Sequence, residues 1–225
     1  MRIAGTVFDL ADWTWHNFRM GLYERYVCPV LVEFALRGGY VKKHRGLALA
    51  GVSGDVLEIG FGTGMNLAFY PPGVEKLTVI DPSGGMHAKA RRRVAESGIE
   101  VESHQLGAEK LPFDAGRFDS VVSTFTMCTI GDLAGALREI RRVLKPGAKL
   151  FFLEHVASAD PKVLRWQNRL NPVQKLLGCG CHINRDIESY IRQGEFEILT
   201  IDRFAMPKSI SIAAPTIRGQ AVKPA

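Results

Sequence analysis

The chain has 225 residues, 46% of them hydrophobic and 23% charged, a balance typical of one soluble α/β domain that needs neither disulfides nor a structural metal to fold. The net charge is +6, but the basic residues are dispersed and no basic stripe is interleaved with aromatic residues, so no nucleic-acid partner is expected. No apolar run reaches the roughly 18 residues of a transmembrane helix. Cysteine usage (Cys 4) and the lack of a signal peptide predict a cytoplasmic protein.

The first elements expected are two or three helices within residues 7–49, where aromatic and aliphatic residues recur at helical spacing. Pro29 is expected in the first turn of one of them. We therefore divide the chain into an N-terminal helical lid or cap segment, residues 1–50, and an α/β ligand-binding part, residues 51–225, within one domain overall.

From residue 55 the pattern alternates between strands and helices. Strands are expected at 55–59, 76–81, 100–104, 120–125 and 149–155, and helices near 65–69, 85–96 and 133–144. A turn at Lys145-Pro146-Gly147 separates the last helix from the last strand. Such alternation predicts right-handed crossovers and a parallel sheet with helices on both faces.

The remainder of the chain is less regular. An irregular or helical insert is expected at 160–178, and a helix near 185–193 with Asn184 as its cap. Two strand-like runs, 195–204 and 216–222, are expected to add an antiparallel hairpin to the sheet edge. The fold predicted is therefore a seven-stranded, mostly parallel sheet with extra N-terminal helices.

A glycine-rich turn follows the first strand. Gly60, Gly62 and Gly64 follow the strand that carries Glu58, and they precede a helix start. Glycines let backbone N–H groups approach a ligand, but the spacing G-x-G-x-G is tighter than that of a dinucleotide-binding loop. It suits a ligand with an amino-acid tail and no phosphates, such as S-adenosylmethionine.

The second strand ends at Asp81, where a carboxylate can accept hydrogen bonds from both ribose hydroxyls. Alone, Asp81 could equally cap the next helix. In register with the glycine loop, it lies where open α/β sheets bind ligands.

Three later segments continue the pattern: Gly107–Phe113, Phe118–Val122 and Ile140–Gly147. With them, residues 55–154 resemble the Rossmann-like class I S-adenosylmethionine-dependent methyltransferases of the ubiquinone/menaquinone-biosynthesis type. The resemblance implies S-adenosyl-L-methionine as cofactor and S-adenosyl-L-homocysteine as product. It places the glycine loop under the methionine moiety, Glu58 as its buttress and Thr124 facing the methionine portion.

The resemblance also assigns the adenosine end of the cofactor. Asp81 matches the ribose-binding acid, and the adenine is expected beside Pro82, Met86 and the backbone N–H of Ala108. One departure concerns the carboxylate that commonly precedes the alanine, because this chain has Gly107 there. Glu109 could substitute for it or face solvent.

The second half resembles the mammalian membrane-associated thiol S-methyltransferases of the methyltransferase-like group, through Ser123–Ile130, Leu153–Ala157 and Gly219–Lys223. The departure is at the N-terminus, where that group has a hydrophobic anchor and this chain has amphipathic helices, so membrane attachment is not carried over. The resemblance implies a small-molecule methyl acceptor, and a thiol is the first expectation. Methylation of an amine, carbon, oxygen or phospholipid head group remains an alternative, and a lipid acceptor would make the basic N-terminal helices a peripheral membrane contact. A non-catalytic S-adenosylmethionine-binding module is a third reading.

His155, at the end of the fifth strand, is the candidate catalytic group that deprotonates or orients the acceptor, and the alternative is a structural histidine. The acceptor-pocket candidates, each of which could instead belong to the core, are Phe125, Met127, Trp166 and Cys181.

The run Cys179-Gly180-Cys181-His182 lacks the second, wider-spaced ligand pair of a structural zinc site, so no metal is expected. Cys28 and Cys128 are expected to be small buried apolar side chains. The basic run Arg91–Arg93 is expected on a solvated helix face.

Overall fold

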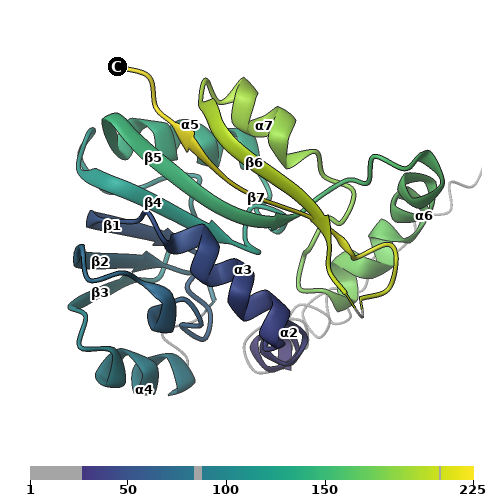
Figure 1. The fold of residues 1–225 in the computed structure, drawn as a ribbon, viewed down its shortest axis with the longest axis horizontal. Helices are drawn as coiled ribbons and strands as arrows, with labels where there is room; N and C mark the ends of the chain where they lie inside the picture. The colour runs from purple at the N-terminus through teal and green to yellow at the C-terminus, as the bar shows by residue number, and fades with distance from the viewer. Residues whose placement is uncertain (1–26, 84–87, 208) are drawn as a thin grey trace, which may run out of the picture.

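The computed structural model describes residues 27–83, 88–207 and 209–225, in which a seven-stranded sheet is covered by helices (Figure 1). The spatial strand order is β3-β2-β1-β4-β5-β7-β6. In chain order the strands are β1 (Gly54–Ile59), β2 (Val74–Ile80), β3 (Val101–His104), β4 (Phe118–Thr124), β5 (Leu144–His155), β6 (Glu197–Ala205) and β7 (Pro215–Val222).

The first five strands are parallel, as the alternation of strands and helices predicted. The middle strands are buried on both faces, as near-continuous apolar runs in a parallel sheet must be. Ile59 pairs with Ile80 and with Ser123, so β1, β2 and β4 end side by side. Their carboxyl ends therefore form one edge at which loop residues meet.

The tail forms the predicted hairpin. β7 pairs antiparallel with β5, and β6 pairs antiparallel with β7 at the sheet edge. The seven-stranded, mostly parallel sheet is thus confirmed.

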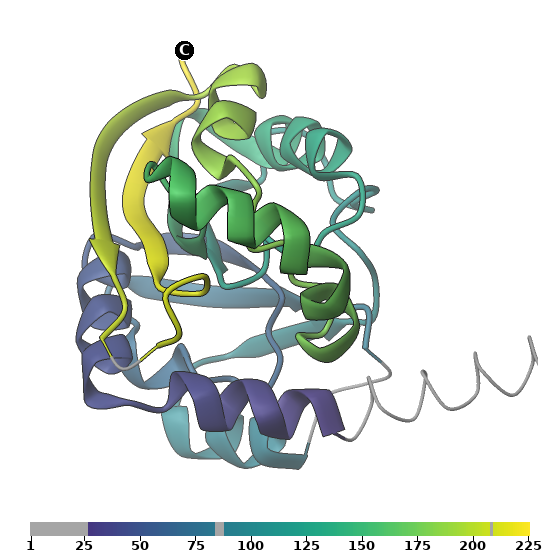
Figure 2. The ribbon, with the colours of Figure 1, turned by 90° about the vertical axis from the view of Figure 1, so that its right-hand side faces the viewer.

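Helices cover both faces of the sheet. They are α2 (Cys28–Leu36), α3 (Gly39–Leu49), the 3₁₀ helix η2 (Leu67–Phe69), α4 (Ala88–Ser97), α5 (Leu133–Val143), α6 (Pro161–Leu177) and α7 (Ile187–Gln193). Ala48 and Leu49 of α3 and Ala90 of α4 belong to the core on one face, whereas α5 and α7 supply the larger core on the other. Turning the molecule shows α2 and α6 at the end to which the parallel strands point (Figure 2).

Three local expectations were wrong. The helix expected at 65–69 is only the short η2, because residues 62–66 form turns and helical geometry begins at Leu67. Its end at Phe69 agrees with the expectation, since Tyr70 takes an extended ψ of 132° before Pro71. Asn184 does not cap α7, whose first turn is capped by Asp186 accepting from Ser189 N at 3.1 Å. The turn Lys145-Pro146-Gly147 lies within β5, where pairing with β4 shifts register and Gly147 takes a φ of +75°.

The helix expected at 85–96 corresponds to α4, which is described from Ala88 onward because residues 84–87 lie outside the described part. The aromatic residues expected in N-terminal helices, from Phe8 to Tyr26, also lie outside it. Pro29 stands in the first turn of α2, as predicted.

Candidate active site

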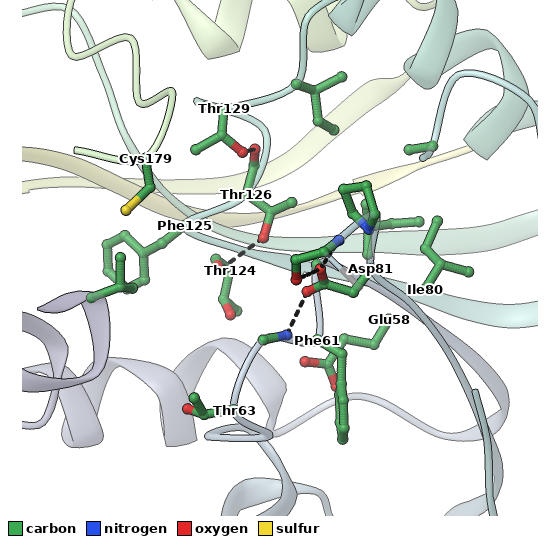
Figure 3. Close-up of a pocket in the computed structure, with 18 of the residues that line it drawn as sticks. Glu58, Phe61, Thr63, Ile80, Asp81, Thr124, Phe125, Thr126, Thr129 and Cys179 are labelled. Atoms are coloured by element: carbon green, nitrogen blue, oxygen red, sulfur yellow. Dashed lines mark hydrogen bonds between the residues drawn. The ribbon is translucent and has the colours of Figure 1, made fainter. Parts of the chain in front are cut away.

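A pocket of about 640 Å³ opens at the carboxyl ends of β1, β2 and β4 (Figure 3). Its walls combine the glycine loop after β1, the segments after β2, β3 and β4, and helix α2. The sequence-predicted cofactor residues Glu58, Gly60, Gly62, Pro82 and Thr124 line it. Three others do so as well: Asp81, Ala108 and Glu109.

The glycine loop needs its glycines for two different reasons. Gly60 has a φ of +76°, and a Cβ there would overlap the side chain of Thr126. Gly62 has a φ of +55°, yet a Cβ there would meet no protein atom within 4 Å. The space above Gly62 is therefore a cradle that a side chain would fill and a ligand can use. Gly64, with a φ of +75°, packs against Leu67 and does not line the pocket.

Asp81 connects the loop to the second strand. Its Oδ2 accepts from the backbone N–H of Gly62 at 2.7 Å, and its Oδ1 accepts from Ser83 N at 2.9 Å and from the Ser83 hydroxyl (Figure 3). The carboxylate is only partly buried. It is thus oriented by the protein while keeping acceptor capacity toward the pocket.

A buried polar network lies beneath the loop. The Arg45 guanidinium of α3, 3% exposed, donates from Nη1 to Asn66 Oδ1 at 2.5 Å and to Thr124 Oγ1 at 2.7 Å. Asn66 Nδ2 donates to Glu58 Oε1 at 2.9 Å, and the Tyr70 hydroxyl donates to Glu58 Oε2 at 2.6 Å. Among the described atoms, Arg45 Nε has no partner. An unpaired buried donor on a pocket wall fits a ligand acceptor, such as a carboxylate.

Burial governs the titration of this network. It raises the pKa of Glu58 to about 7, against the hydrogen bonds from Tyr70 and Asn66 and the nearby charge of Arg45. It lowers the pKa of Arg45 to about 10, so the guanidinium stays charged at neutral pH.

The opposite end of the pocket is formed by the segments after β3 and β4. Ala108 is buried there, and Ile130 lies across the same pocket. A Cβ at Gly107 would overlap the Glu109 carboxylate, which therefore folds back over the position where the family carries an acid. Glu109 both lines the pocket and is exposed to solvent, so the structure does not choose between the two expected roles. Met86 lies outside the described residues.

Helix α2 closes one side of the pocket with Val32 and Leu36. A disulfide joins Cys28 of α2 to Cys179, with a Cα–Cα distance of 5.9 Å, so the expectation of a buried free thiol at Cys28 was wrong. Glu33 pairs with Lys89 at 3.1 Å and with Arg93 at 2.8 Å.

The basic run of α4 is therefore not simply a solvated face. Arg93 also donates to the Thr63 carbonyl at 2.7 Å, and so fixes the glycine loop to α4.

The acceptor-side predictions fare unevenly. Phe125 lines the pocket. Of the described residues, three expected in its wall do not line it: Met127, Trp166 and Cys181. Met127 is 0% exposed within the core, whereas Trp166 is 55% exposed on α6. The reason is that α6 docks through its fully buried neighbour Gln167, whose amide bonds Val156, Ile183 and Ile212 carbonyls, so the adjacent indole points outward.

His155 also lies outside the pocket lining. Its ring packs 4.9 Å from that of Phe125, and a ring nitrogen lies within 4.8 Å of the Cys181 sulfur. The Cys181 Sγ is 3.4 Å from that of Cys128. Hydrogen bonds with Cys128 and His155 lower the pKa of Cys181 to about 5, and the Cys128–Cys181 contact together with burial raises the pKa of Cys128.

Sequence reasoning missed Arg45, Asn66 and the Cys28–Cys179 pair. Asn66 follows the glycine loop closely enough to have been noticed. Arg45 carries no local signal, because 79 residues separate it from its partner Thr124.

Together, a seven-stranded Rossmann-like sheet, a glycine loop and an acid at the second strand end define a class I S-adenosylmethionine-dependent methyltransferase. A family model described as a methyltransferase domain matches residues 57–152. The thiol S-methyltransferase TMT1B of Rattus norvegicus is 35% identical over 181 residues, covering 78% of this chain and 74% of the rat protein. The thiol S-methyltransferase TMT1A of Homo sapiens is 34% identical over 180 residues, covering 77% and 73%.

The solved structure of a putative methyltransferase from Bacillus halodurans matches with a TM-score of 0.67 at 19% identity, covering 84% of this chain and 100% of that one. That likeness shows the fold alone. The two curated relatives show the family: this chain belongs to the S-adenosylmethionine-dependent methyltransferases that include TMT1A and TMT1B. None of the described helices combines the length and apolar character that crossing a membrane requires.

Proposed function

We propose that this enzyme transfers the methyl group of S-adenosylmethionine to the sulfur of a small thiol. The observation that carries the proposal is the similarity to the thiol S-methyltransferases, which extends over 78% of the chain and so reaches beyond residues 57–152, the part that matches the methyltransferase domain.

The pocket fits the cofactor at three places. The cradle over Gly62 takes the methionine portion, and the unpaired Arg45 Nε meets its carboxylate. Asp81 takes the ribose hydroxyls, and the wall containing Ala108 and Ile130 takes the adenine. When bound, the cofactor supplies an electrophilic methyl carbon on a positively charged sulfur.

The acceptor wall fits an uncharged thiol. Val32, Leu36 and Phe125 are its apolar residues. Its polar groups are the Thr126 and Thr129 hydroxyls (Figure 3) and the Glu33 carboxylate of α2, whose charge is paired with Lys89 and Arg93. The protein aligns the acceptor sulfur with the methyl carbon and excludes water. The thiol loses its proton to solvent, and its thiolate is favoured near the positive cofactor sulfur. His155, beside Phe125 rather than in the lining, positions that ring.

A phospholipid head group is the second candidate. Large exposed apolar side chains lie on α2 (Leu31 and Phe34) and on α6 (Trp166 and Leu177), at the same end of the molecule (Figure 2). Such a surface could contact a lipid layer.

A matched acceptor panel separates these candidates. The enzyme would be incubated with labelled S-adenosylmethionine and an alkyl thiol, or the alcohol or amine of the same chain length, or phosphatidylethanolamine vesicles. We expect labelled methyl thioether from the thiol and S-adenosylhomocysteine in equal amount. Methylation of the amine or lipid without the thiol would reject the thiol proposal.

A further inference from the structure

A cluster of three potential metal ligands lies next to Phe125, on the side away from the pocket. It consists of Cys128 after β4, His155 at the end of β5 and Cys181 between α6 and α7, and their ligand atoms all lie within 4.8 Å of one another. The sequence analysis expected no metal in this chain, and its argument rested on the run 179–182. The fold separates that run, because Cys179 is disulfide-bonded to Cys28, and it instead brings together three distant segments.

The donor set and spacing suit a zinc ion. Thiolates and imidazole are its preferred ligands, at about 2.3 Å for sulfur and 2.0–2.1 Å for nitrogen. Tetrahedral angles then put two ligand sulfurs about 3.8 Å apart. The Cys128 and Cys181 sulfurs are 3.4 Å apart, so an ion requires these two to move by only a few tenths of an ångström. The His155 nitrogen lies within 4.8 Å of both sulfurs, and closing on the ion requires its ring to shift by up to about 1 Å.

The backbone around the cluster is held in place. His182 N donates to the Cys128 carbonyl at 2.8 Å, and Cys181 N donates to the Gly178 carbonyl at 3.0 Å. Arg185 Nη1 bonds the carbonyls of Met127 and Ile130 at 2.7 and 2.6 Å, on either side of Cys128. Two of the three ligands are therefore fixed by hydrogen bonds that do not use their side chains.

Charge and burial also fit a divalent cation. Cys128 is 1% exposed and Cys181 7%. Two buried thiolates would repel each other, whereas a divalent cation neutralises them. Two charged groups lie beside Cys128: the Arg185 guanidinium, and the Glu154 carboxylate, which accepts from Ser123 Oγ, Thr126 N and Met127 N.

We propose that Cys128, His155 and Cys181 form a three-ligand site for Zn²⁺, with a fourth position taken by water or another small donor. Both cysteines bind as thiolates, and any thiol proton still on them is released to solvent when the ion binds. The ion would join the loop after β4 to the segment before α7, and Thr129 and Cys179 of these two segments line the pocket. The proposal does not depend on which acceptor is methylated.

The test is titration of the reduced, metal-free enzyme with Co²⁺, a spectroscopic substitute for Zn²⁺. We expect saturation at one equivalent, with a thiolate charge-transfer band in the near ultraviolet, visible bands typical of tetrahedral Co²⁺, and displacement of both by Zn²⁺. Cys128→Ala, Cys181→Ala and His155→Gln should each lose the one-equivalent signal. Two matched controls should retain it: His182→Gln, from the same local run, and Cys28→Ser/Cys179→Ser, which removes the other thiols.

Wild-type enzyme that gives no stoichiometric thiolate–Co²⁺ spectrum would overturn the proposal. So would equal loss of the signal in the His182→Gln variant. A Cys128–Cys181 disulfide that survives mild reduction, seen as a 2 Da mass deficit in the double serine variant, would also reject it. If the alanine variants do not fold, the test rests on two results: the Co²⁺ stoichiometry of the wild type, and the loss of signal in His155→Gln, a substitution of a half-buried residue.

Discussion

Asp81 has two tasks at the residue scale. It already accepts from Gly62 N and Ser83 N, and in the proposed complex it also accepts from ribose hydroxyls. Replacing it therefore removes a ligand contact and loosens the loop that cradles the cofactor.

Asp81→Ala should weaken S-adenosylmethionine binding by about 1–3 kcal/mol, the usual effect of losing hydrogen bonds to a charged group. Calorimetry measures this as a roughly 5- to 150-fold rise in Kd. Asp81→Asn, which keeps one acceptor oxygen, should lie between wild type and alanine. An unchanged Kd for Asp81→Ala would show that Asp81 does not bind the ribose.

A variant of Arg45 can test binding of the cofactor carboxylate separately from binding of the adenosine portion. Arg45→Lys keeps the charge but removes Nε, so S-adenosylhomocysteine should bind at least about tenfold more weakly, since a charge-assisted hydrogen bond contributes about 1.5–3 kcal/mol. 5′-Methylthioadenosine lacks the amino-acid carboxylate and should bind wild type and variant equally. Calorimetry measures both affinities. If Arg45→Lys weakened both ligands equally, Arg45 Nε would not be the group that binds the carboxylate.

Glu58 makes stability depend on pH. Burial raises the pKa of Glu58 in the folded protein to about 7, above its ordinary value of 4.5. The folded state therefore holds this proton more tightly than the unfolded state does. The resulting contribution to the free energy of unfolding is full below pH 4.5 and is lost as pH rises through 7. The Tm of the ligand-free enzyme should therefore fall, relative to that of Glu58→Gln, between these values. Parallel Tm–pH curves for the two proteins would show that Glu58 keeps an ordinary pKa.

At the scale of elements, the Cys28–Cys179 disulfide holds α2 over the pocket. Cys28→Ser and Cys179→Ser should each destabilise the fold by about 2–4 kcal/mol, a typical effect of losing a disulfide. Thermal unfolding provides an internal control: a reductant should lower the wild-type Tm to that of the variants and leave the variants unchanged. A wild-type Tm insensitive to reductant would mean that the bond does not form in solution.

Elements with strong local patterns were predictable. The five parallel strands, the tail hairpin and the proline start of α2 follow from periodicity and turn residues, and these were confirmed. The helix expected at 65–69 was wrong at its start, because the turns of the glycine loop continue through Asn66, and helical periodicity does not encode them.

The residues of the candidate site also fall into a predictable and an unpredictable group. Asp81 and the glycine loop are set by strand ends, so their position in the pocket was predictable. Arg45 and the cluster of Cys128, His155 and Cys181 depend on how distant segments meet, and no local spacing encodes that. Trp166 shows the same limit, because its exposure follows from which face of α6 docks.

For the whole molecule, cofactor binding should couple to global stability. At a ligand concentration about 100 times its Kd, binding to the folded state alone adds about 2.7 kcal/mol. In a chain of this size, about 1 kcal/mol shifts Tm by roughly 2–4 °C, so S-adenosylhomocysteine should raise Tm by about 5–10 °C. Scanning calorimetry with Asp81→Ala in parallel should show a smaller rise in the variant, and equal rises would place binding elsewhere.

The disulfide that ties α2 to the pocket also has a kinetic meaning. Cys28 and Cys179 are 151 residues apart, and between them lie β1 to β5, whose parallel pairs each require a crossover. Ordering so long a loop is entropically costly, and contacts of high sequence separation form slowly. The sheet edge with its glycine loop can therefore form before α2 meets the segment after α6. A chain that has paired its central strands would have a cofactor cradle with one wall still open, and we expect α2 to enclose the pocket late in folding.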